Sequence, residues 1–284
     1  MAQVTVITPS LNYAHFIDDA LASVRGQKGA AVLHLVQDGG SSDDTAEVVG
    51  RYPEVEWHCE QDTGQSDALN KALERVTAPW VGWLNADEFY LPGALDMLIA
   101  HGERTGADVV YGDAVFVDAE GRLQRLLPQH RFSNFVLRHY GCYIPTCATV
   151  FRRGALGESP WDDDARLVMD WRVFLKIQKR GGRYAHVKYP AGAFRVHDDR
   201  VSAAPMESFG KEIAATRRSF GINRTPPLAG HIAHAALKAL DGAYLRQLRA
   251  QKLRSADLRW FASEAGHGTV DRLLRQAYRG AARR

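Results

Sequence analysis

Short apolar runs recur along the first half of the chain, and each is followed by a polar cluster and then by apolar residues at helical spacing. Residues 4–8 form the first run, Pro9 ends it, and residues 16–24 carry apolar side chains three and four positions apart. Such runs are typical of buried strands, and the spacing that follows is typical of amphipathic helices. The pattern predicts strands at 4–8, 31–37, 55–59 and around Trp83-Leu84, and helices at 16–24, 46–49 and 68–73.

Four strand and helix units in succession predict the fold class. Such alternation is typical of an open α/β sheet with right-handed crossovers. We therefore expect a single Rossmann-like, mostly parallel sheet flanked by helices, with a C-terminal helical extension. In sheets of this kind ligands bind beyond the carboxyl ends of the strands, where this chain has polar clusters at 8–12, 38–45, 62–67 and 85–88.

The last of these clusters contains two adjacent carboxylates, Asp87 and Glu88, and the amide of Asn85. Acidic side chains at the end of a buried strand are costly unless they reach water or a cation. They predict a metal and phosphate site. The alternative is an acidic turn before the helix start at residues 91–93.

The regular alternation fails after the apolar runs at 108–113 and 115–117. Helical spacing returns at 170–177, short strand-like runs follow at 184–187 and 193–197, and a boundary is expected before Pro205. The expected organisation is a main domain at 1–204, with halves at about 1–115 and about 116–204, and an extension at 205–284. Within the extension, helical patterns cover 207–220, 230–253 and 256–278.

Charge separates these two parts. The 284 residues have a formal net charge of +3, but residues 205–284 alone carry +9, which leaves −6 on the first 204 residues. A basic helical extension predicts peripheral contact with an anionic membrane surface, and the alternative is a packing or homodimer helix pair with a solvated basic face. The aromatic residues of the extension have the spacing of a helix core, so nucleic acid is not an expected partner.

Location follows from cysteine content and apolar run length. Cys59, Cys142 and Cys147 show no paired or metal-type spacing, which favours a reducing compartment. No apolar run approaches the roughly 20 residues needed to span a bilayer, and the N-terminus begins directly with a strand pattern rather than a signal peptide. We expect a cytoplasmic protein, peripheral at most to the inner face of a membrane.

Several motifs together carry a family resemblance. Residues 8–12, 37–45, 62–71 and 83–88, followed by 169–176 and by 194–197 with Ser202, resemble those of a family 2 glycosyltransferase with the A-type nucleotide-sugar fold. The resemblance implies that residues 1–115 are a nucleotide-binding half and residues 116–204 an acceptor half. The family pattern usually has Asp at the positions of Asn85 and Glu88, so this chain departs from it there.

The implied activity is inverting, metal-dependent transfer of a sugar from a nucleotide diphosphate sugar, with a UDP-sugar favoured, to a hydroxyl of a glycan or lipid-linked glycan in cell-surface polysaccharide biosynthesis. Such a donor needs acceptors for its base and ribose, and a cation for its diphosphate. Asp38 is expected at the base, with an Asx turn as the structural alternative. The expected donor-binding residues are Thr8, Pro9, Ser10, Asn12, Asp38, Gly39, Asp62, Gln65, Asp67, Asn70, Lys71, Asn85, Ala86 and Asp87.

A cation and a base complete the expected site. Asp87, Glu88 and His197 are the candidate ligands for Mn²⁺ or Mg²⁺, since such ions take one or two carboxylates together with phosphate oxygens. Asp170 is the candidate catalytic base, because a partly apolar setting raises a carboxyl pKa, and its alternative is a helix N-cap. Trp171 and Arg195 are expected on the acceptor side.

Two other functions fit the same motifs. A noncatalytic nucleotide-sugar or glycan-binding module is favoured by the departures at Asn85 and Glu88. A sugar nucleotidyltransferase would need a Gly-rich basic triphosphate loop after the first strand, and residues 8–13 offer none. This second alternative therefore ranks lower.

Overall fold

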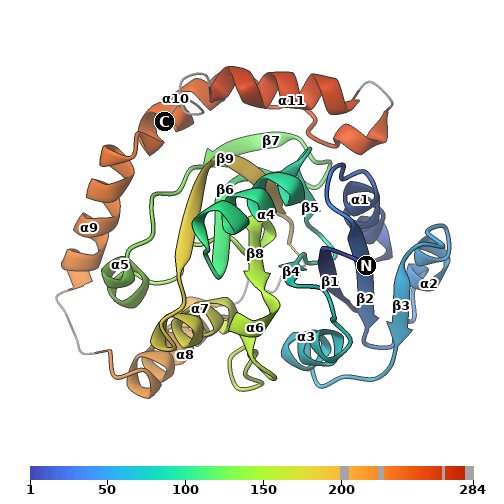
Figure 1. Ribbon diagram of the computed structural model, residues 1–284, viewed down its shortest axis with the longest axis horizontal. Helices are drawn as coiled ribbons and strands as arrows, with labels where there is room; N and C mark the ends of the chain where they lie inside the picture. The colour runs from blue at the N-terminus through green and yellow to red at the C-terminus, as the bar shows by residue number, and fades with distance from the viewer. Residues whose placement is uncertain (199–204, 223–226, 264–265, 279–284) are drawn as a thin grey trace.

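The computed structural model describes residues 1–198, 205–222, 227–263 and 266–278, which form one sheet with helices against it and around its edge (Figure 1). The first half alternates strands and helices as predicted. In the structure the fourth strand ends at Trp83, one residue earlier than the predicted run. The elements are β1 (Val4–Ser10), α1 (Ala14–Arg25), β2 (Val32–Asp38), α2 (Thr45–Val49), β3 (Glu56–Cys59), α3 (Gln65–Glu74) and β4 (Trp80–Trp83).

This half of the sheet is parallel throughout. The strand order is β3-β2-β1-β4, and each neighbouring pair runs in the same direction. β1 lies between two strands and has helices over the sheet, so all seven of its residues are buried. Because parallel strands end at one edge, the segments after β1, β2, β3 and β4 converge there.

The second half is mixed. β8 (Thr149–Arg152) lies antiparallel between β4 and β6 (Val109–Val117), while β9 (Tyr184–Arg195) runs parallel to β6. The two strand-like runs predicted at 184–187 and 193–197 belong to this one strand. The remaining elements of this half are β5 (Phe89–Tyr90), α4 (Ala94–Thr105), β7 (Leu123–Leu127), α5 (Asn134–His139), η1 (Thr146–Ala148), α6 (Arg153–Leu156) and α7 (Met169–Lys179).

The C-terminal helices follow the perimeter of the sheet (Figure 1). The single helical pattern predicted at 230–253 is broken at Gly242, whose φ of 71° is a left-handed conformation that glycine adopts without strain. The boundary expected before Pro205, and Ser202 with it, lie outside the described residues. The elements are α8 (Met206–Ser219), α9 (Pro227–Leu240), α10 (Ala243–Ala250), η3 (Gln251–Leu253), η4 (Trp260–Ala262) and α11 (Gly266–Ala277).

A buried ionic cluster fastens this extension to the sheet. Asp113 of β6 is fully buried, and its carboxylate accepts hydrogen bonds from Arg246 Nε (3.0 Å) and Tyr278 Oη (2.8 Å). His186 Nε2 lies 2.8 Å from the other carboxylate oxygen, which also accepts from Gln129 N. Burial raises the pKa of Asp113, but the hydrogen bond and charge of His186 and the charge of Arg246 outweigh it and hold the pKa below its ordinary value.

Among the helices in the described ranges, none combines the length and apolar character required to cross a bilayer.

The Asp113 cluster predicts that Arg246 is required for stability. In Arg246→Ala the buried carboxylate loses its guanidinium partner, so the free energy of unfolding should fall by about 3–5 kcal/mol. Urea denaturation measures this loss. The matched control is Arg249→Ala on the exposed side of the same helix, expected within about 0.5 kcal/mol of wild type. Equal stability of the two variants would contradict the proposed role of the cluster.

Candidate active site

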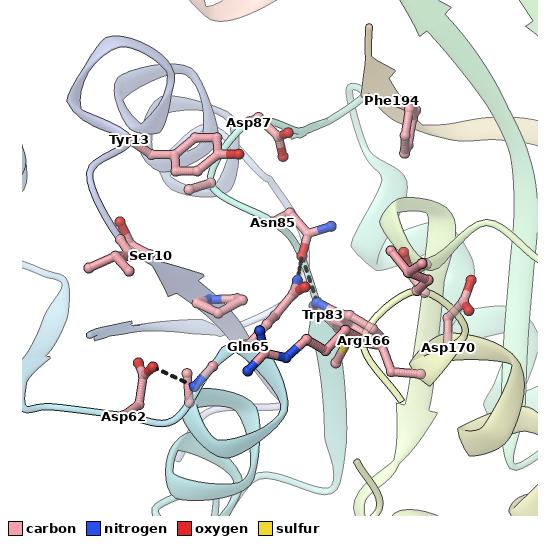
Figure 2. Close-up of a pocket in the computed structure, with 18 residues that line it drawn as sticks. Ser10, Tyr13, Asp62, Gln65, Trp83, Asn85, Asp87, Arg166, Asp170 and Phe194 are labelled. Carbon is pink, nitrogen blue, oxygen red and sulfur yellow. Dashed lines mark hydrogen bonds between the residues drawn. The ribbon is translucent and has the colours of Figure 1, made fainter. Parts of the chain in front are cut away.

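A cavity of about 460 Å³ lies at the edge of the sheet where β1 and β4 end (Figure 2). Its wall combines the segment after β1, the start of α3, the β4–β5 loop and the segment that enters α7. The cavity brings together segments that are far apart in sequence, as the strand-end pattern predicts. Eight of the predicted site residues line it: Pro9, Ser10, Asp62, Gln65, Asn85, Ala86, Asp87 and Asp170.

Asn85 holds two neighbours in place. Its Oδ1 accepts hydrogen bonds from Trp83 Nε1 (2.8 Å) and from Gln65 Nε2 (2.7 Å), as Figure 2 shows. An aspartate could accept the same two bonds. The amide at this position therefore preserves the geometry of the cavity while removing one negative charge.

Asp87 is held from both its backbone and its side chain. Its carbonyl oxygen accepts a hydrogen bond from Arg195 Nε (2.9 Å), and its Oδ2 lies 2.9 Å from His197 Nε2. Arg195 is 1% exposed, and its Nη2 donates to Asp19 of α1 at 2.5 Å. Arg195 was expected on the acceptor side, but its side chain does not line the cavity. Its guanidinium instead fixes the loop that carries Asp87.

Glu88 differs from the expected metal ligand. Its side chain is buried, Oε2 accepts from Asn85 N (3.1 Å), and Oε1 has no hydrogen-bond partner among the described residues. Burial, reinforced by the charge of Asp87, raises the pKa of Glu88 well above its ordinary value. Glu88 thus faces the protein interior and does not line the cavity, which is a poor position for a cation ligand.

The predicted trio of metal ligands is accordingly not assembled. No cluster of three His, Cys, Asp or Glu side chains suited to a metal occurs in the described part of the chain. Asp87 and His197 remain as an adjacent carboxylate and imidazole, with Asp87 on the cavity wall. Two protein ligands suit Mg²⁺ or Mn²⁺ when phosphate oxygens and water supply the others.

Asp170 lies in the first turn of α7 and faces the cavity (Figure 2). Val168 occupies the N-cap position of α7. Asp170 is therefore not the helix N-cap, which was its alternative role in the sequence analysis. Its Oδ1 accepts from Trp171 N (2.6 Å). Burial raises its pKa despite this bond and a second one from the Cys142 thiol. A carboxyl of raised pKa in a cavity has the properties of a general base.

Trp171 belongs to the core rather than to the acceptor side. Its side chain is 1% exposed, and its indole Nε1 donates to Leu137 O (2.6 Å). The ring packs in the hydrophobic core and does not line the cavity.

Asp38 adopts the Asx-turn alternative. Its Oδ1 accepts from Gly40 N (2.9 Å) and Ser41 N (2.7 Å), and its Oδ2 accepts from Ser41 Oγ (2.7 Å). The side chain is fully buried and does not line the cavity. A Cβ on Gly39 would lie 2.5 Å from Asp62 Oδ2, so glycine at this position leaves room for Asp62. Asp62 is the carboxylate of this region that reaches the cavity.

Thr8 and Asn12 do not line the cavity. Thr8 Oγ1 lies 2.9 Å from the buried His34 Nε2, and Asn12 Oδ1 accepts from Ser42 N (2.8 Å). Asn12 has a φ of 58°, which asparagine tolerates better than most residues. The two side chains join β1 to β2 and the loops that follow them.

Three predicted donor contacts on α3 are likewise engaged with protein. Asn70 Nδ2 donates to Trp161 O (2.8 Å). Lys71 Nζ lies 3.0 Å from Asp67 Oδ2 and donates to Gln61 O. These contacts position the segments at residues 61 and 161, and none of the three side chains lines the cavity.

Other cavity residues were not identified from the sequence. Arg166 projects beside Gln65 (Figure 2), and its Nη2 lies 3.5 Å from Thr63 O. It follows an acidic loop and belongs to no motif, so nothing in the sequence separates it from an ordinary surface arginine. The other residues found only in the structure are Leu11, Tyr13, Gly64, Ala68, Trp83, Thr146, Leu167, Met169 and Phe194.

Known proteins resemble this chain in sequence. The model of Glycosyl transferase family 2 matches residues 5–158. The succinoglycan biosynthesis protein ExoU of Rhizobium meliloti is 32% identical over 205 residues, which cover 64% of this chain and 58% of ExoU.

Two solved structures share the fold. TarS of S. aureus, residues 1–349 with UDP-GlcNAc, superposes with a TM-score of 0.61 at 16% identity over 97% of this chain and 90% of that one. Mannosyltransferase PcManGT of Pyrobaculum calidifontis, with GDP-Man and Mn²⁺, gives 0.56 at 19% identity over 97% and 86%. The match to the family model extends over more than half of the sequence, and the chain therefore belongs to glycosyltransferase family 2.

Proposed function

We propose that this glycosyltransferase is inverting and metal-dependent, and that it moves a sugar from a nucleotide diphosphate sugar to a hydroxyl of a glycan or lipid-linked glycan. A UDP-sugar is the favoured donor, and cell-surface polysaccharide biosynthesis is the proposed setting. The complex of TarS with UDP-GlcNAc and the biosynthetic role in the name of ExoU support these assignments. The proposed location is the cytoplasm, at the inner face of the membrane.

One observation carries the proposal: the cavity presents carboxylates from separate walls. Asp62 follows β3 and Asp170 belongs to α7, and the two lie on opposite sides of the cavity in Figure 2. Asp87 comes from the β4–β5 loop between them in the sequence. This separation gives a donor and a base distinct places within one cavity.

The donor side is assigned to the strand-end residues. Asp62 can accept from the ribose or base, and Gln65 is oriented by its bond to Asn85. Ser10 lines the cavity with a buried Oγ that has no hydrogen-bond partner among the described residues. Because an unsatisfied buried hydroxyl is costly, a polar group of the donor is its natural partner.

The cation is assigned to Asp87 and His197. Mn²⁺ or Mg²⁺, when bound there, would neutralise charge on the diphosphate leaving group. The adjacency of these two side chains and the position of Asp87 on the cavity wall support this assignment.

Asp170 is assigned as the base. Its carboxylate takes the proton of the acceptor hydroxyl as the hydroxyl oxygen forms a bond to the anomeric carbon. The bond from that carbon to the diphosphate breaks on the opposite face, and the nucleoside diphosphate leaves with the bonding pair. The raised pKa of Asp170 makes the carboxylate a stronger proton acceptor than an exposed aspartate.

A noncatalytic nucleotide-sugar or glycan-binding module remains the second candidate, because Glu88 is unsuited to a cation and Asn85 carries no charge. Assays with a panel of UDP-, GDP-, TDP- and CMP-sugars and Mn²⁺ separate the two functions. Binding without turnover across all donors and acceptors would favour the module.

Asp170→Asn is expected to reduce the transfer rate by about 10²–10⁴-fold, because the amide cannot accept the proton. Nucleotide affinity should stay near that of wild type, since the substitution preserves size. Initial rates and calorimetric titration with nucleotide measure the two quantities. Wild-type turnover in this variant would overturn the base assignment.

The same base predicts a pH profile. The active form of Asp170 is deprotonated, and its pKa is raised above 3.8, so activity should be full above the raised pKa and fall as pH drops through it. The acidic limb of kcat against pH should therefore lie above the pH expected for an unperturbed aspartate. A limb at or below 3.8 would contradict this prediction.

Asp87→Ala should weaken nucleotide binding in the presence of Mn²⁺ by at least about tenfold, because it removes the charged cation ligand. Binding without metal should change little. Glu88→Gln is the matched control, since it changes the neighbouring acidic side chain, which does not line the cavity. If Glu88→Gln lost Mn²⁺-dependent binding and Asp87→Ala kept it, the ligand assignment would be reversed.

A further inference from the structure

The C-terminal extension exposes several large apolar side chains on α9 and α10. Leu240 is 73% exposed at the end of α9, and Leu245 and Leu248 of α10 are 60% and 58% exposed. These helices lie on the perimeter of the molecule, away from β1 to β3 (Figure 1). The exposed apolar residues of these two helices are named the outer ridge, which consists of Leu228, Ile232, Leu240, Tyr244, Leu245 and Leu248.

The outer ridge is not needed to hold the helices in place. The opposite side of α10 supplies Ala243, Arg246 and Ala250, which are buried. Leu237 of α9 packs against the core cluster that includes α5 and α7. The extension is therefore anchored by one side, and its apolar outer side is available for a partner.

The exposed charged side chains of residues 227–254 are basic. Asp241 is the only acidic residue between positions 227 and 254. Its side chain is 7% exposed and accepts a hydrogen bond from Arg131 N. Arg249, Lys252 and Arg254 are exposed, so the surface beside the outer ridge is basic.

We propose that the outer ridge docks on an anionic lipid surface. Apolar side chains on a helix enter the interface between lipid head groups and chains, and flanking arginine and lysine residues bind anionic head groups. A second copy of this chain fits less well, because a symmetric contact would bring Arg249, Lys252 and Arg254 against their like-charged equivalents.

The structure changes how the basic extension would work. Arg246 belongs to the basic extension, but its side chain is buried against Asp113 and does not reach the outer surface. The apolar side chains, rather than a basic face alone, are presented outward. This inference rests on the proposed function in one respect, since lipid binding would bring the enzyme close to a lipid-linked acceptor. Lipid binding itself can be measured without any substrate.

Co-sedimentation of the full chain with vesicles tests the proposal. Wild type should bind vesicles of phosphatidylcholine mixed with phosphatidylglycerol, and bind phosphatidylcholine alone at least tenfold more weakly. Leu245→Glu combined with Leu248→Glu should reduce binding to the mixed vesicles at least tenfold. The single variant Leu248→Glu should also weaken binding, and its matched control is Trp57→Glu, which places one negative charge at an exposed apolar residue of β3. Thermal melting of each variant checks that it is folded.

The outcomes discriminate between lipid and protein partners. Lipid binding by wild type and by Trp57→Glu, together with its loss in the folded double variant, supports the proposal. If the wild-type protein does not co-sediment with the mixed vesicles, the proposal is wrong. A double variant that binds lipid normally but changes from dimer to monomer in analytical ultracentrifugation also overturns it, since the outer ridge would then be a subunit interface. Neither result alters the donor and base assignments, which the transfer assays test separately.

Discussion

The buried guanidinium of Arg195 is the interaction on which the site depends most directly. It comes from the end of β9 and binds the carbonyl of Asp87, the carboxylate of Asp19 in α1, and the carbonyl of Ala119. Three segments that are distant in sequence thus meet at one planar donor. Arginine suits this position because its fixed fork of N–H groups can satisfy several oxygens at once. The loop that carries Asp87 is consequently positioned by the second half of the chain.

The parallel half of the sheet was predictable because its signal is local. Each strand is a short apolar run, each run ends in turn-forming polar residues, and the parallel arrangement brings those ends to one edge. Asp62, Asp87 and Asp170 all line the resulting cavity. The antiparallel insertion of β8 between β4 and β6 was not predictable in this way, since strand pairing is a long-range property that run length does not encode.

The direction taken by individual side chains was harder to foresee. Asp38 and Asp62 both follow strands, yet Asp38 is occupied by its own turn while Asp62 reaches the cavity. The difference depends on whether nearby backbone N–H groups satisfy the carboxylate. Trp171 and Arg195 stand in motifs as well, but burial turns both side chains inward. Motif membership therefore located the site more reliably than it identified contacts with a ligand.

The Asp113 cluster has a consequence for the order in which the parts of the chain fold during their synthesis. A nascent chain that has emerged through residue 240 contains Asp113 and His186 but neither Arg246 nor Tyr278, which complete the cluster. Closing the sheet around an incompletely paired carboxylate is unfavourable. The final packing of β6 therefore requires residues 246 and 278, so it follows the synthesis and docking of the C-terminal helices.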